Sequence, residues 1–219
     1  MGADKRVDQA RLLYERAVFA GDTGALAAAD LELDAVEADL AVARGRVLHG
    51  RLLARREAGE PAGEDPRELA LFARAAELYR ARGDVRGEAE ALFWVGAVHQ
   101  VVRGDHDAAV PDLERSAELA AKAGDLLTLS YALRHLGIAE HAAGRLGAAR
   151  ERLEESTRLR REVGFMPGVA ANLVGLAYVA LAEDRREDAA ALLDEGTAIA
   201  EASGAAAILG QLEEARAAL

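Results

Sequence analysis

The sequence of 219 residues contains no cysteine, which excludes disulfide bonds, thiolate zinc sites and a cysteine nucleophile. It is also poor in aromatic residues, at 4%, and it has only four prolines. A strand-rich fold needs more β-branched and aromatic residues, whereas the residues in excess along this chain are good helix formers. The length suits one domain. We therefore predict a single all-α domain.

The net charge of the chain is −11, which repels the phosphate backbone of nucleic acids. Charged residues interrupt every apolar stretch before about 18 residues, the length that a membrane helix requires. The first residues also lack the apolar core of a signal peptide. These absences predict a cytoplasmic protein that binds neither nucleic acid nor membrane.

The most informative feature present is an internal repeat of forty residues. When the units are aligned, four positions hold the same or similar small or apolar residues in three successive units, always forty residues apart. These four columns are Ala109, Ala149 and Ala189; Leu113, Leu153 and Leu193; Ser116, Ser156 and Gly196; and Gly124, Gly164 and Gly204. Upstream the spacing becomes forty-one, as from Gly83 to Gly124 and from Gly96 to Gly137. We predict that the additional residue lies in a turn at residues 102–105.

Each unit is predicted to contain two helices, because apolar residues follow helical spacing over residues 129–144 and again over 146–164. Small residues leave room for the facing helix at Gly96, Gly137 and Ala177. A single helix pair cannot bury both of its faces, so successive pairs must stack into a right-handed superhelix. Six leucines are predicted to be buried between the layers: Leu92, Leu113, Leu133, Leu153, Leu173 and Leu193. Gly137 should therefore not tolerate a large side chain. Gly168 is not one of these small positions at the helix contact, so it should tolerate alanine.

The unit resembles the tetratricopeptide repeat through a run of small and apolar residues: Ala132, Leu133, Leu136, Gly137, Gly144, Ala149, Leu153 and Ser156. Its length of forty residues is similar to that of the repeats in bacterial signalling regulators. The resemblance implies an α-solenoid with N-terminal helices (1–35), a divergent repeat (36–83), three repeats (84–124, 125–164 and 165–204) and a capping helix (205–219). A helix break between Asp30 and Asp34 is left open.

The resemblance also implies a protein- or peptide-binding module, because the family binds extended peptides or helices in its concave groove. Carried over to this chain, the groove residues are Phe93, Gln100, Tyr131, Arg134, His141 and Tyr178. The family's carboxylate clamps use several cations, and this groove shows only Arg134, so a chaperone's terminal carboxylate is disfavoured as a ligand. There are two alternatives, both with a pocket in the same groove. One is a protein that binds a small apolar molecule, and the other is an enzyme of secondary metabolism.

A polar pocket is a second interpretation of the same helices, because Trp94 and His135 occupy equivalent places in successive units, as do His99 and Glu140. A histidine there could accept a proton, with Glu140 tuning its pKa. Packing between repeats is the favoured explanation, since no nucleophile, oxyanion donor or cofactor motif accompanies these residues. His135 and His141 lie six residues apart, on different faces of a helix. We predict no catalytic residue, cofactor or metal.

Charge is distributed unevenly along the chain. Five arginines lie in residues 44–56 without an acid between them, whereas residues 165–219 hold nine acids and three arginines. Solvated faces explain this, and self-association into a homodimer through the basic N-terminal and acidic C-terminal faces is the alternative.

Overall fold

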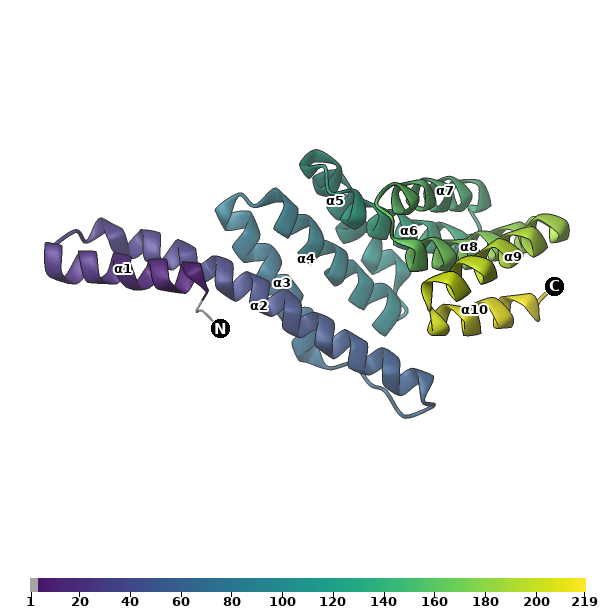
Figure 1. The fold of residues 1–219 in the computed structure, drawn as a ribbon, viewed down its shortest axis with the longest axis horizontal. Helices are drawn as coiled ribbons and strands as arrows, with labels where there is room; N and C mark the ends of the chain where they lie inside the picture. Colours follow the sequence, from purple (N-terminus) through teal and green to yellow (C-terminus); the bar gives the residue numbers. More distant parts are fainter. Residues whose placement is uncertain (1–3) are drawn as a thin grey trace.

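The computed structural model describes residues 4–219, which form ten α-helices, one π-helical turn and no strand (Figure 1). The helices are α1 (Lys5–Ala20), α2 (Gly24–Glu57), α3 (Pro66–Arg82), α4 (Val85–Ala97), α5 (His106–Ala123), α6 (Leu126–Ala142), α7 (Leu146–Glu162), α8 (Met166–Ala182), α9 (Arg186–Ser203) and α10 (Ala206–Arg216). Successive helices pack on one another along the stack. The predicted all-α solenoid of helix pairs is confirmed.

Close approach of the two helices in each pair depends on the small residues of the first helix. A Cβ atom on Gly96 would lie 2.6 Å from Leu113 Cγ, and one on Gly137 would lie 2.9 Å from Leu153 Cγ. The six leucines predicted between the layers are all buried, with exposed fractions of 0–6%. Leu113 and Leu153 therefore fill the space that the missing side chains of Gly96 and Gly137 leave.

Replacing Gly137 by leucine should lower the free energy of unfolding by about 1–3 kcal/mol or more, because the added side chain would drive α6 away from α7. Chemical denaturation followed by circular dichroism measures the loss. Gly147→Leu is the matched control, since a Cβ atom on Gly147 would meet no atom within 4 Å. An equal loss of stability in both variants would contradict this account of the packing.

The expected tolerance of Gly168 to alanine is wrong. Gly168 is buried, and its Cβ atom would lie 2.4 Å from the Phe165 ring and 3.0 Å from Arg160 Cδ. The prediction took account only of the contact between the two helices of a pair. Gly168 instead contacts Arg160 near the end of α7 and Phe165 just before α8.

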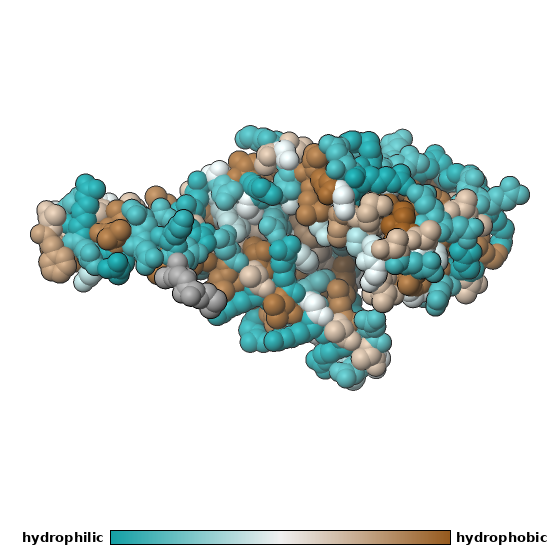
Figure 2. Space-filling model, in the orientation of Figure 1, coloured by the Kyte–Doolittle hydropathy of each residue, from teal (hydrophilic) through white to brown (hydrophobic). Residues whose placement is uncertain are grey.

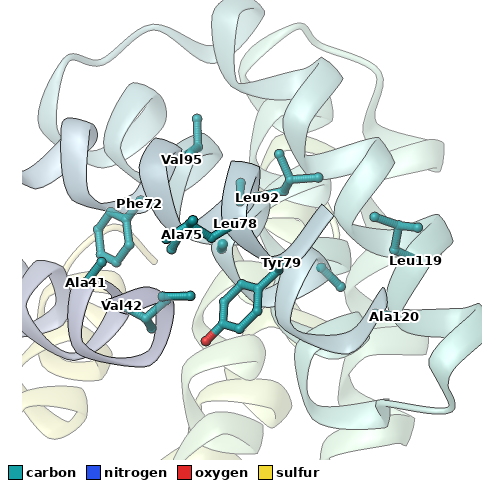
Figure 3. Close-up of a cluster of buried hydrophobic side chains, with 14 of the residues drawn as sticks. Ala41, Val42, Phe72, Ala75, Leu78, Tyr79, Leu92, Val95, Leu119 and Ala120 are labelled. Atoms are coloured by element: carbon teal, nitrogen blue, oxygen red, sulfur yellow. The ribbon is translucent and has the colours of Figure 1, made fainter. Parts of the chain in front are cut away.

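The N-terminal third is built on α2, a single helix of 34 residues with no break between Asp30 and Asp34. The boundary predicted between residues 35 and 36 therefore falls inside one helix. Its second half pairs with α3 as the other repeats do, because a Cβ atom on Gly45 would lie 2.6 Å from the Phe72 ring. Phe72 lies with Ala41 and Val42 in the buried cluster of Figure 3. The first half of α2 and α1 project from the stack as a two-helix hairpin (Figure 1).

The additional residue of the forty-one-residue unit does not lie in the turn at 102–105. A π-helical turn, Val98–Val102, continues α4, and its backbone bond runs from Arg103 N to Val98 O at 3.2 Å. A π-turn accommodates one residue more than an α-turn of the same height. The insertion is therefore absorbed inside the helix, at the level of Gln100.

Candidate functional site

A buried polar cluster lies between α6, α7 and α8. Ser130, Arg160 and Asn172 are at most 1% exposed. The equivalent positions of the neighbouring repeats hold buried alanines: Ala89 and Ala170 for Ser130, Ala120 and Ala200 for Arg160, and Ala91 and Ala132 for Asn172. Packing of the repeats thus requires only a methyl group at these positions. The polar side chains are an addition confined to one layer.

Two guanidinium groups meet in this cluster. Arg160 Nη1 donates to Gly168 O at 2.7 Å and to Asn172 Oδ1 at 2.9 Å. Arg134 Nη1 donates to Ala171 O at 2.6 Å and to the same Asn172 Oδ1 at 3.2 Å. Because both arginines donate to one oxygen atom, their positive charges are adjacent. Within residues 4–219 neither forms an ion pair, and Arg160 Nη2 is buried without a hydrogen-bond partner.

Aromatic rings cover the Arg160 guanidinium. Its Cζ atom lies 4.9 Å from the centre of the Tyr131 ring and 5.6 Å from that of Phe165. Both rings, together with Arg134 and Arg160, line a pocket of about 200 Å³, to which α10 contributes Ile208. The pocket thus combines two cations with an apolar wall.

Burial opposes the charge of both arginines. Desolvation lowers the pKa of Arg134 to about 10. Desolvation, followed by the positive charge of Arg134, lowers the pKa of Arg160 to about 9. A buried cation without a carboxylate partner is costly to the fold. An anion beside the two guanidinium groups would offset that cost and raise both pKa values.

His135 lies beside this pair but is bonded differently. Its Nδ1 atom is 2.6 Å from Gln100 Oε1, and Gln100 Nε2 donates to His135 O at 2.9 Å. Burial, and then the charges of Arg134 and Arg160, lower the pKa of His135 to about 3. The ring is therefore neutral near pH 7 and cannot serve as an acid–base group there.

The predicted groove residues divide between core and surface. Phe93 and Gln100 are 4% and 5% exposed, so their expected presentation on an open inner face is wrong. The π-turn and the contact with the next layer turn Gln100 toward His135. Tyr131 and Arg134 line the pocket, whereas His141 and Tyr178 are partly exposed and lie outside it.

The predicted polar pocket is not assembled as one site. Trp94 stacks on Phe72 at 5.3 Å, and Phe93 contacts both Trp94 and His135, at 5.0 and 5.3 Å between ring centres. His99 lies against Arg103, and Glu140 forms its ion pair with Arg145. These pairings leave Glu140 engaged elsewhere, so it does not tune a histidine.

Arg160 is the residue that the sequence reasoning missed. The signal was available, because residues forty before and after it are alanines, Ala120 and Ala200. Comparing columns for residues that depart from the repeat, as well as for residues that recur, would have found it.

No helix within residues 4–219 combines the length and the apolar character that crossing a membrane requires. Nor does this range hold a group of three potential metal ligands.

Known proteins similar to this chain are built from the same kind of stacked helix pairs. Residues 87–162 match the tetratricopeptide repeat family. The fold is similar to the crystal structure of apo RapI, with a TM-score of 0.63 and 14% identity over 91% of this chain and 70% of that one. It is also similar to TPR-like repeats of a kinesin light chain from Podospora anserina, with a TM-score of 0.53 and 18% identity over 80% of this chain and 96% of that one. A search of curated proteins finds no sequence match. Residues 87–162 therefore carry tetratricopeptide repeats, and they lie within a stack of helices whose fold is similar to that of TPR-like repeat proteins.

Proposed function

We propose that this chain is a non-catalytic module that binds a protein or peptide partner, and that the pocket between α6 and α8 receives a carboxylate group of that partner. The observation that carries the proposal is the pair of adjacent guanidinium groups, Arg134 and Arg160, which have no acid partner within residues 4–219. A guanidinium pairs with a carboxylate through short, charge-assisted hydrogen bonds.

Arg160 changes the expectation drawn from the sequence. A terminal carboxylate was disfavoured because the first helices of the repeats supply only Arg134. The second cation comes from α7, the second helix of its pair, and it reaches the same Asn172 oxygen. The ring of Tyr131 beside it suits an apolar group next to the carboxylate.

Size favours a peptide over a free small molecule as the ligand. Pockets for drug-sized molecules occupy about 300–1,000 Å³, whereas this pocket holds about 200 Å³. It fits one acidic side chain or one chain end of a longer ligand. The alternative of an enzyme with its pocket in the groove gains no support from His135, because a ring that is neutral and bonded to Gln100 offers no proton to a substrate.

Peptide capture tests the proposal. The immobilised protein is exposed to two peptide pools of equal composition, one with free carboxyl ends and one with carboxamide ends, and mass spectrometry counts the bound peptides. We expect enrichment of free carboxyl ends or of acidic residues. Arg134→Ala and Arg160→Met should each reduce capture about tenfold or more, as loss of a charge-assisted hydrogen bond predicts.

Arg158→Ala is the matched control, because Arg158 lies two residues from Arg160 on α7 with its side chain 58% exposed. Its capture should equal that of the wild type. Melting curves of all variants exclude loss of the fold as the cause. Capture of neutral, amidated peptides that neither pocket variant weakens would contradict the proposal.

A further inference from the structure

Exposed apolar side chains are concentrated at one end of the molecule. Within residues 4–219, thirteen large apolar side chains are exposed, and eleven of them lie in α1 and α2: Val7, Leu12, Tyr14, Val18, Phe19, Leu26, Leu31, Leu33, Leu40, Val47 and Leu53. Figure 2 shows apolar residues at the surface of the projecting hairpin. The residues that α1 itself buries are only Ala10 and Ala17. Such a concentration marks an interaction surface.

Four of these residues form a regular stripe on α2. Leu26, Leu33, Leu40 and Val47 follow one another at intervals of seven residues, and their exposed fractions are 45–52%. Residues seven apart lie on one side of a helix, and this interval is the repeat with which one helix packs along another. The apolar stripe defined by these four residues therefore has the geometry of a helix–helix seam.

A charged stripe accompanies it. Each apolar residue is followed four residues later by a charged one, giving Asp30, Glu37, Arg44 and Arg51. Residues four apart are neighbours on the helix surface. The first half of α2 is thus acidic beside the apolar stripe and the second half is basic. Within residues 4–219, Asp30, Arg44 and Arg51 form no ion pair, and Glu37 pairs with Arg74 at 2.7 Å.

We propose that the occupant of this surface is a second copy of the chain, whose α2 runs antiparallel to the first. An antiparallel arrangement brings the acidic half of each α2 against the basic half of the other, whereas a parallel one brings like charges together. A two-fold axis near Leu40 places Leu33 opposite Val47 of the second copy. The same axis, within one residue, places Asp30 opposite Arg51 and Glu37 opposite Arg44. One self-complementary surface is what a two-fold dimer requires.

The groove between α2 and α3 continues the seam. It has a volume of about 790 Å³, and its lining consists of Ala43, Val47, Leu48, Ala70 and Leu71 with Arg44, Arg51, Arg67 and Arg74. The first half of the seam lies in residues 17–43, which hold six acids and no Lys or Arg. The acidic first half of α2 of one copy thus meets an apolar groove with an arginine rim on the other, at a site separate from the pocket proposed to bind a carboxylate.

Sedimentation velocity at micromolar concentration tests the dimer. We expect the wild-type chain to sediment as a dimer and Leu40→Glu, which places two carboxylates at the axis, to sediment as a monomer with unchanged helicity. Leu53→Glu is the matched control, since Leu53 is 43% exposed on the same helix but outside the apolar stripe. It should remain a dimer. A folded wild-type chain that stays monomeric, or equal effects of both variants, would overturn the proposal.

Two further experiments test the orientation. Because the chain has no cysteine, Leu40→Cys should form an interchain disulfide under mild oxidation at least about tenfold faster than Leu53→Cys. The double variants Asp30→Arg with Glu37→Arg and Arg44→Glu with Arg51→Glu should each be monomeric alone and form a one-to-one dimer when mixed. Failure of the mixture to associate, or loss of the dimer on reversing Glu213 and Glu214 near the C-terminus instead, would overturn the antiparallel arrangement.

Discussion

Leu153→Ala should lower the free energy of unfolding by about 2–5 kcal/mol, because it removes a buried side chain and leaves a cavity. Leu153 is 1% exposed. Its Cγ atom lies 2.9 Å from the position of a Cβ atom on Gly137, and its Cδ1 atom lies 3.3 Å from the equivalent position on Gly175. The side chain therefore joins α6, α7 and α8. In a stacked repeat protein the loss is transmitted to both neighbouring layers.

Chemical denaturation of the wild type and of Leu153→Ala measures this loss of stability. The control is Leu127→Ala, which truncates a leucine that is 40% exposed at the start of α6. Its effect should stay near 0.5 kcal/mol, as is usual for surface substitutions. If Leu153→Ala were as stable as the wild type, the forty-residue register on which the whole fold rests would be wrong.

Arg160→Met should raise the free energy of unfolding by about 1–4 kcal/mol while weakening peptide capture about tenfold or more. Replacing a buried charge by an apolar side chain of similar length removes the cost of desolvating that charge. Methionine would keep an apolar contact with the Tyr131 ring. The neighbouring repeats already hold an apolar residue, alanine, at the equivalent positions. Higher stability with weaker binding is the signature of a residue retained for function.

The stability gained by Arg160→Met should decrease at high pH. Burial lowers the pKa of Arg160 to about 9 in the folded state, from its ordinary value of 12.5. The cost of this charge is therefore fully present below about pH 9, and it decreases as pH rises toward the unfolded value, since the unfolded chain then binds more protons. We expect the advantage of Arg160→Met to be constant up to about pH 8 and to shrink above about pH 9.

Arg158→Met serves as the control for both measurements, because Arg158 is exposed and pairs with Glu155 and Glu162. Its stability should remain within about 0.5 kcal/mol of the wild type. A loss of stability in Arg160→Met would instead assign Arg160 a structural role, in which its bonds to Gly168 and Asn172 fasten α7 to α8.

Most of the fold followed from local patterns. Helical spacing predicted the paired helices, and the small residues Gly96 and Gly137 predicted where they approach each other. These features act over a few residues or over one repeat, so they can be read from the chain. The continuity of α2 between Asp30 and Asp34 was left open. The π-turn at residues 98–102 was missed, because no glycine or proline marks its place in the sequence.

The candidate site was only half predictable. Tyr131 and Arg134 were identified because they lie on the first helix of a repeat, where the family places its ligand-binding residues. Arg160 lies on the second helix, and only folding brings its guanidinium to the Asn172 oxygen that Arg134 also bonds. Phe93 and Gln100 were expected at the surface, yet contacts with adjacent layers bury them.

The sequence by itself determined the repeat, the all-α class and the burial of the leucines, because each depends on spacing along the chain. The tertiary structure decided which polar side chains share a pocket and which apolar ones remain uncovered. Those outcomes depend on distances between residues of different helices and on the desolvation that packing imposes. The spacing of Leu26, Leu33, Leu40 and Val47 was always visible in the chain, but only the fold established that no other helix within residues 4–219 covers them.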